Sequence, residues 1–155
     1  MATCKYVSDV KIIHNNQELI YNFLSNFENL AKFFNEEAME KIAEQAPKKF
    51  KLKDFKADQD TCTFVVEGFG ETGLRIIERE EPKSIKITGN GTVPFEFYFW
   101  VQLLPVDTYQ TKLRLTLHAE LNMMMKMMLG KKLEEGINQV AEGFTKIPFH
   151  LLAQQ

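Results

Sequence analysis

Residues 111–152 read TKLRLTLHAELNMMMKMMLGKKLEEGINQVAEGFTKIPFHLL, and the period of their apolar residues changes partway along. Apolar and polar residues alternate over Thr111–Leu121, which is typical of a strand with one buried face. From Met123 to about Leu152 the apolar residues instead recur at steps of three and four, as in a helix that lies on an apolar surface. We therefore expect the last strand of a sheet to run directly into a long closing helix that bends or overhangs the domain, with Pro148 as the expected place.

The alternating pattern extends upstream of this junction. It predicts six strands, which are Lys49–Phe55, Thr61–Glu67, Gly73–Arg79, Ser84–Thr88, Phe95–Leu103 and Thr111–Leu121. The turns between them are too short for parallel crossovers, so consecutive strands are expected to pair antiparallel. One face of this sheet is apolar and the other is polar, with Arg79 expected on the polar face.

The first part of the chain predicts a strand and two helices. Cys4–Ile13 alternates, with Tyr6 and Ile12 on one expected face. Asn16 is a good N-cap for a helix that continues to Phe27. A second helical stretch begins near Glu28 and ends before Pro47. The whole order predicts an α+β fold in which a seven-stranded antiparallel sheet packs against the long last helix.

Length and composition restrict the class of protein. The 155 residues favour one domain over residues 1–155, and a content of 45% hydrophobic and 26% charged residues is ordinary for a globular protein. The net charge of −2 gives no positive field for nucleic acid. We find no signal peptide and no apolar run long enough to cross a membrane, so a cytoplasmic protein is expected, with Cys4 and Cys62 as reduced thiols.

The order of elements resembles that of the START-like superfamily, also called Bet v 1-like or SRPBCC, which includes polyketide cyclase-like proteins. Two segments carry the resemblance: VKIIHNNQELIYNFL at 10–24 matches the entry from strand to helix, and LGKKLEEGINQVAEGF at 129–144 matches the closing helix. The resemblance implies a helix-grip fold with a cavity for apolar ligands between the curved sheet and the last helix. It implies no family-wide catalytic residues. The glycine-rich loop of the plant allergen branch is replaced here by Ala57-Asp58-Gln59-Asp60.

Alternation and the helical stripe together predict which side chains line that space. We expect a hydrophobic small molecule or lipid-like ligand, with no cofactor and no metal, to contact Phe64, Val66, Leu74, Ile76, Phe95, Phe97, Phe99, Leu115 and Leu117 from the sheet and Met125, Met128, Leu133, Ile137 and Val140 from the helix. Methionine repacks easily around apolar partners, so the five Met between Met123 and Met128 favour either an adaptable lining at the cavity mouth or simple core filling.

Four other motifs each have a functional and a structural interpretation. Gly68-Phe69-Gly70-Glu71-Thr72-Gly73 fits a dinucleotide-binding pattern, but the residues that follow are strand-like, which favours a hairpin. His118 and Glu120 fall on the polar face without further metal ligands. The inward-facing Ser8 either orients a ligand or bonds a neighbouring carbonyl. The lysines between Lys48 and Lys56 favour protection of an exposed sheet edge over the attraction of anions.

Three functions stay open at this point. The first is ligand binding, and the second is a cyclase, dehydratase or hydrolase using the same cavity, which would need ionisable groups inside it. The third is a protein-interaction module or homodimer through Tyr98 and Trp100 on the polar face, although these rings could equally pack against Lys86 or Arg114.

Overall fold

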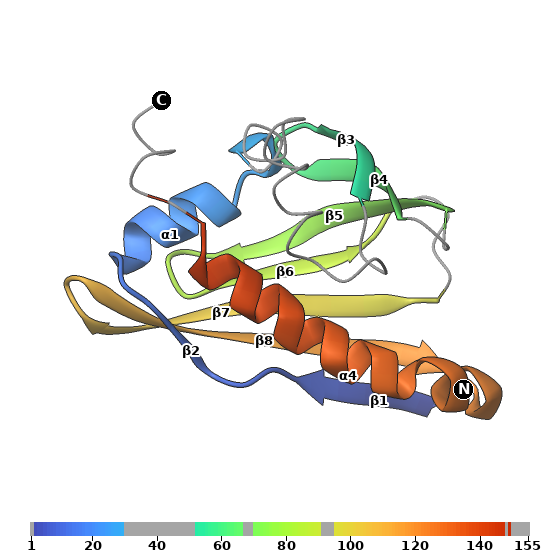
Figure 1. The fold of residues 1–155 in the computed structure, drawn as a ribbon. Coiled ribbons are helices and arrows are strands. Elements are labelled where there is room, and N and C mark those ends of the chain that lie inside the picture. Colours follow the sequence, from blue (N-terminus) through green and yellow to red (C-terminus); the bar gives the residue numbers. More distant parts are fainter. Residues whose placement is uncertain (1, 30–51, 67–69, 91–94, 148, 150–155) are drawn as a thin grey trace.

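A curved antiparallel sheet with one long helix across its inner face dominates the computed structural model, which describes residues 2–29, 52–66, 70–90, 95–147 and 149 (Figure 1). The elements are β1 (Ala2–Val7), β2 (Lys11–Ile13), α1 (Gln17–Leu24), β3 (Leu52–Ala57), β4 (Thr61–Val66), β5 (Gly70–Glu80), β6 (Ser84–Gly89), β7 (Phe97–Asp107), β8 (Gln110–Leu121) and α4 (Met123–Thr145). The predicted α+β helix-grip architecture is confirmed. Most of the predicted second helix, together with residues 48–51, 148 and 150–152, lies outside the described residues.

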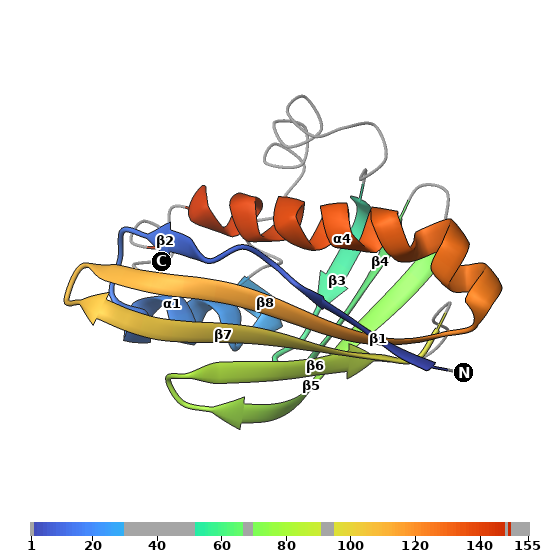
Figure 2. The same cartoon turned by 90° about the horizontal axis from the view of Figure 1, so that it is seen from below.

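The strands pair in the order β1-β8-β7-β6-β5-β4-β3, and β2 also pairs with β8. Every pairing is antiparallel, as the short turns predict. The lysine-rich strand β3 lies at an edge of the sheet, the position at which lysine discourages edge-to-edge aggregation. Figure 2 shows α4 running along one side of the sheet, where it packs chiefly on β8, β1 and β2.

The prediction of one continuous strand over Cys4–Ile13 is wrong. The chain leaves the sheet at Ser8, so the sheet has eight strands within the described residues instead of the seven predicted. The face also changes, because Ile13 is buried whereas Ile12 is 45% exposed. Ser8 Oγ donates to the carbonyl of Asp9 and accepts from the backbone N–H of Leu115, which is the structural role for this serine. The interruption also frees the backbone N–H of Asp9 to donate to Asn138 Oδ1 of α4 at 2.8 Å.

Two irregularities in the sheet also differ from the prediction. The pairing of β5 with β6 shifts between Ile76 and Glu78, as in a β-bulge, so that Arg79 lies opposite the buried Ile85 and not on the polar face. From there its guanidinium donates to the carbonyl of Ser25 at 2.8 Å, just after α1. The strand predicted to end at Leu103 continues as β7 through Pro105 to Asp107, with a shift in the pairing to β8.

Local sequence explains where the helices begin and end. Asn16 caps α1 as predicted, because its Oδ1 accepts from the backbone N–H groups of Glu18 and Leu19 at 2.9 and 3.3 Å. Helix α1 ends at Leu24 and not at Phe27, although Phe27 is buried. Helix α4 ends at Thr145 instead of near Leu152. Within the described residues, no helix is long and apolar enough to cross a membrane.

Candidate functional site

The inner face of the sheet, which is the face toward α4, aligns apolar side chains across five strands. The register places one row of partners across β1, β8, β7, β6 and β5, namely Tyr6, Leu117, Phe99, Ile87 and Ile76. Phe97 and Leu115 lie on the same face in the neighbouring rows, where they pair with Ala119 and Val101. The predicted alternation is therefore confirmed over most of the central sheet.

Burial along this face is uneven. The end near α1 is a closed core, whose nearly inaccessible side chains include Ile85, Val101, Leu103, Leu113 and Leu115. Toward the other end burial is mixed. Ala119 and Leu121 of β8 are nearly inaccessible, whereas six apolar side chains pack against the core but are only partly buried, namely Phe55, Phe64, Leu74, Phe95, Phe97 and Phe99. The aromatic-rich part of the inner face is therefore less completely buried than the end near α1.

Aromatic pairs form in the aromatic-rich, partly buried part of the inner face. Phe55 and Phe64 stack across β3 and β4, with ring centroids 6.0 Å apart and an interplanar angle of 11°. Phe95 and Phe97 meet edge to face, at 5.8 Å and 63°. Both geometries are favourable for aromatic rings, and they hold the rings in place while leaving part of their surface accessible.

Helix α4 contributes fewer of the predicted residues than expected. Ile137 is buried, and Met125 and Leu133 pack against the core. Met128 and Val140, expected to face the sheet, are instead 66% and 41% exposed. Nine residues at 100° each place Met128 half a turn away from Ile137, so both cannot face the sheet. Val66 lies in β4, but its side chain is outside the described residues.

Two of the described inner side chains, Tyr6 and Cys62, carry groups with shifted pKa values. Burial raises the pKa of the Tyr6 hydroxyl, with smaller contributions from Cys4 and Glu134 in the same direction. Burial also raises the pKa of the Cys62 thiol to about 12. Both groups are therefore neutral at pH 7. Among the described residues, no group of three or more His, Cys, Asp or Glu side chains could hold a metal ion.

Three inner residues escaped the sequence-based site. Tyr6 shares the row of Phe99, Phe55 stacks on Phe64, and Phe144 packs against the core from α4. The signal for Tyr6 was its place on the inner side of an alternating strand, and Phe144 belongs to the helical stripe. The signal for Phe55 was weak, because the lysines around it in the sequence obscure the apolar pattern of its strand.

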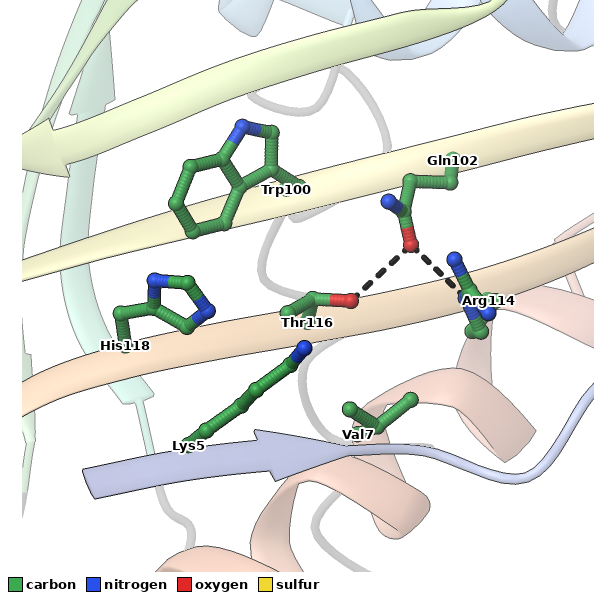
Figure 3. A pocket seen from close by; sticks show the side chains of 7 residues that line it. All are labelled: Lys5, Val7, Trp100, Gln102, Arg114, Thr116 and His118. Carbon is green, nitrogen blue, oxygen red and sulfur yellow. Dashed lines mark hydrogen bonds between the residues drawn. The ribbon is translucent and has the colours of Figure 1, made fainter.

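The outer face of the sheet carries a different arrangement (Figure 3). A shallow hollow of about 210 Å³ is lined by Lys5, Val7, Trp100, Gln102, Arg114, Thr116 and His118. Gln102 Oε1 accepts from Arg114 Nε and Thr116 Oγ1, both at 2.9 Å. The Lys86 ammonium lies 4.7 Å from the centre of the Tyr98 ring and 5.3 Å from that of Trp100. The two aromatic rings therefore pack on a long neighbour, one of the two alternatives expected for them.

The glycine motif, His118 and Glu120 all make structural contacts. Gly70 to Gly73 begin strand β5, so no helix N-terminus follows to hold a pyrophosphate. Gly73 permits a close approach, because a Cβ there would lie 2.2 Å from the carbonyl oxygen of Asn90. His118 packs edge to face on Trp100 at 4.6 Å, and Glu120 accepts a hydrogen bond from Thr3.

This geometry can be compared with known proteins. No family profile and no curated protein sequence matches the chain. Similarity to solved structures nevertheless defines the class: the chain has the START/Bet v 1-like fold.

Three of the similar structures illustrate how far the likeness extends. Norcoclaurine synthase from Thalictrum flavum has a TM-score of 0.67 at 11% identity, over 94% of this chain and 86% of the synthase. A START superfamily protein from Mycobacterium smegmatis has a TM-score of 0.53 at 14% identity, over 89% of this chain and 98% of that one. The Aha1 dimer from Colwellia psychrerythraea has a TM-score of 0.54 at 18% identity, over 91% of this chain and 92% of the Aha1 chain. At these identities the likeness concerns the fold alone.

Proposed function

We propose that the protein binds a hydrophobic small molecule or lipid-like ligand between the inner face of the sheet and α4. The observation that carries the proposal is the uneven burial of that face. Phe64, Phe97 and Phe99 keep accessible apolar surface on the inner side, whereas Val101 and Leu115 further along the same sheet are closed. Covering such surface contributes about 25 cal/mol per Å², so a ligand that fills the space would gain affinity mainly from apolar contact.

The fold neighbours are compatible with this proposal. One norcoclaurine synthase structure is described as a complex with dopamine and hydroxybenzaldehyde, which are small aromatic compounds. In the present chain the inner aromatic rings would contact the apolar part of a ligand. The Tyr6 hydroxyl, which is neutral at pH 7 and whose pKa burial raises further, would offer a hydrogen bond to its polar end.

Titration with an environment-sensitive apolar dye tests the proposal. The native protein should bind the dye saturably, and Phe97→Ser or Phe99→Ser should weaken binding about tenfold, since each removes a large apolar contact. Tyr98→Ser is the matched control, because Tyr98 lies between these residues on the same strand but is 46% exposed on the outer face. Equal losses in all three variants, or no saturable binding by a folded protein, would contradict the proposal.

A second candidate is an enzyme, a cyclase, dehydratase or hydrolase, that uses the same space. It is favoured by the likeness to a synthase. Against it, the inner groups Tyr6 and Cys62 both have raised pKa values, and neither is a base near pH 7. The Arg79 guanidinium is engaged by the carbonyl of Ser25 and the carboxylate of Asp60. If a compound bound by the wild type changes mass on incubation, and Tyr6→Phe abolishes that change, the chain is an enzyme and not only a binding protein.

A third candidate is an interaction module or homodimer built on Tyr98 and Trp100. It is favoured by the 46% exposure of Tyr98 and by the likeness to a dimer of Aha1. Size-exclusion chromatography of the wild type and Trp100→Ala separates it from the others. A wild-type dimer that Trp100→Ala converts to a monomer would support this candidate. A monomer in both cases would contradict the homodimer.

A further inference from the structure

The first two turns of α4 present an unusual amount of apolar surface to solvent. Met123 and Met127 are both 82% exposed, Met124 is 70% exposed and Met128 is 66% exposed. We call this segment the methionine tip, and it comprises Met123, Met124, Lys126, Met127, Met128, Lys131 and Lys132. Contiguous exposed apolar residues on a protein surface mark interaction sites more often than isolated ones do.

Helix geometry excludes core filling as the explanation. Met123 and Ala141 are eighteen residues apart, which is five complete turns, so they project from the same side of α4. Ala141 is fully buried, whereas Met123 is 82% exposed. The first turn of the helix therefore lies beyond the surface that buries the later turns. Of the five clustered methionines, Met125 packs against the core, and the other four have no place in it.

Along the chain from Leu121 to Leu133, every charged residue is a lysine. Lys126, Lys131 and Lys132 are exposed, and no Asp or Glu occurs from Leu121 to Leu133. The chain as a whole has a net charge of −2, so the tip is a local basic region on a slightly acidic protein. A second copy of the same surface would bring lysine against lysine, whereas a negatively charged surface would be attracted.

The position of the tip leaves it accessible. Figures 1 and 2 place the start of α4 at one end of the sheet, beside the N-terminus of the chain and at the end opposite the turn between β7 and β8. The tip is thus the exposed end of a helix. Flexible apolar side chains with basic neighbours at such an end suit a fluid, anionic interface better than a partner of fixed shape.

We propose that the methionine tip docks the protein reversibly onto an anionic lipid bilayer. The methionine side chains enter the interfacial region of the bilayer, and the three lysines meet the lipid phosphates and carboxylates. Acidic residues resume at Glu134 and Glu135, so docking is confined to the first turns of the helix. The proposal is independent of the ligand proposal, because none of the tip residues packs in the inner site described above.

Sedimentation with vesicles tests the docking proposal. The full chain should sediment with vesicles of phosphatidylcholine and phosphatidylserine, much less with phosphatidylcholine alone, and less as salt is raised. Met123→Gln with Met127→Gln, and separately Lys131→Glu with Lys132→Glu, should each weaken binding about tenfold or more. Circular dichroism should show that these variants keep the fold, since the substituted side chains are exposed.

Matched controls lie elsewhere on the surface. Leu104→Gln with Tyr109→Gln removes apolar residues that are 62% and 77% exposed near the β7–β8 turn, and Lys83→Glu with Lys112→Glu reverses two exposed lysines. Both controls should leave vesicle binding unchanged. The proposal is overturned if the wild type does not bind anionic vesicles, or if control and tip variants lose binding equally. Retention on immobilised polyglutamate without vesicle binding would assign the tip to an acidic protein instead.

Discussion

Gly73 shows how one backbone position constrains the sheet next to the candidate site. The Gly73 carbonyl oxygen accepts a hydrogen bond from the backbone N–H of Asn90 at 2.9 Å. A Cβ on residue 73 would lie only 2.2 Å from the carbonyl oxygen of Asn90. Gly73→Ala should therefore destabilise the protein by about 2 kcal/mol or more, because backbone has to move. Urea unfolding measures this loss.

Gly143 provides the comparison for that measurement. It is exposed within α4, and a Cβ there would have no atom within 4 Å apart from its chain neighbours and the backbone of the helix itself. Gly143→Ala should stabilise the protein by about 0.5–1 kcal/mol through helix propensity. Similar losses of stability in both variants would mean that the close contact at Asn90 is not what requires glycine.

At the same scale, single residues show what the sequence could predict. The inward positions of Phe97, Phe99 and Leu117 followed from alternation alone, because a strand has a strict period of two. The error at Met128 is one of helical phase, because Met128 lies half a turn from Ile137. The exposure of Met123 did not follow from the pattern, since it depends on where the surface beneath the helix ends. Hydrophobicity predicts that a side chain prefers burial, but the length of the covering sheet decides whether it is buried.

Among the elements, α1 depends on its N-cap. Asn16→Ala should lower the free energy of unfolding by about 1 kcal/mol, because the backbone N–H groups of Glu18 and Leu19 lose their acceptor. Asn22→Ala, an exposed position within the same helix, should be neutral or slightly stabilising. Thermal unfolding of the two variants distinguishes a cap from a general preference for alanine, and equal melting temperatures would refute the capping role.

The order and type of the described elements were predictable, and the errors concern interruptions. A period of two cannot reveal that Ser8 ends β1, since the residues on both sides keep alternating. The bulge near Ile77 turned Arg79 toward the carbonyl of Ser25, which lies 54 residues away in the sequence. Both features depend on contacts between segments that are distant in the sequence. Ser8 bonds to Leu115, and Arg79 bonds to the carbonyl that follows α1. Local pattern carries no information about such contacts.

For the whole molecule, the uneven burial of the inner face connects fold with function. Helix α4 packs chiefly on β8, β1 and β2, and the core closes around α1. Aromatic side chains from β3, β4 and β7 line the part of the inner face that stays incompletely buried. The START/Bet v 1-like fold thus supplies a rigid sheet with an apolar inner side. In our proposal a hydrophobic ligand completes the packing there.

Native mass spectrometry of the freshly purified full chain tests this central claim most directly. The intact ion should carry a non-covalent mass of a small apolar compound, or acquire one when such a compound is added, and the bare 18.0 kDa chain should return on denaturation. Phe97→Ser should retain less of this mass than Tyr98→Ser. A folded native chain that carries no added mass, and takes up none from a panel of apolar compounds, would contradict the claim.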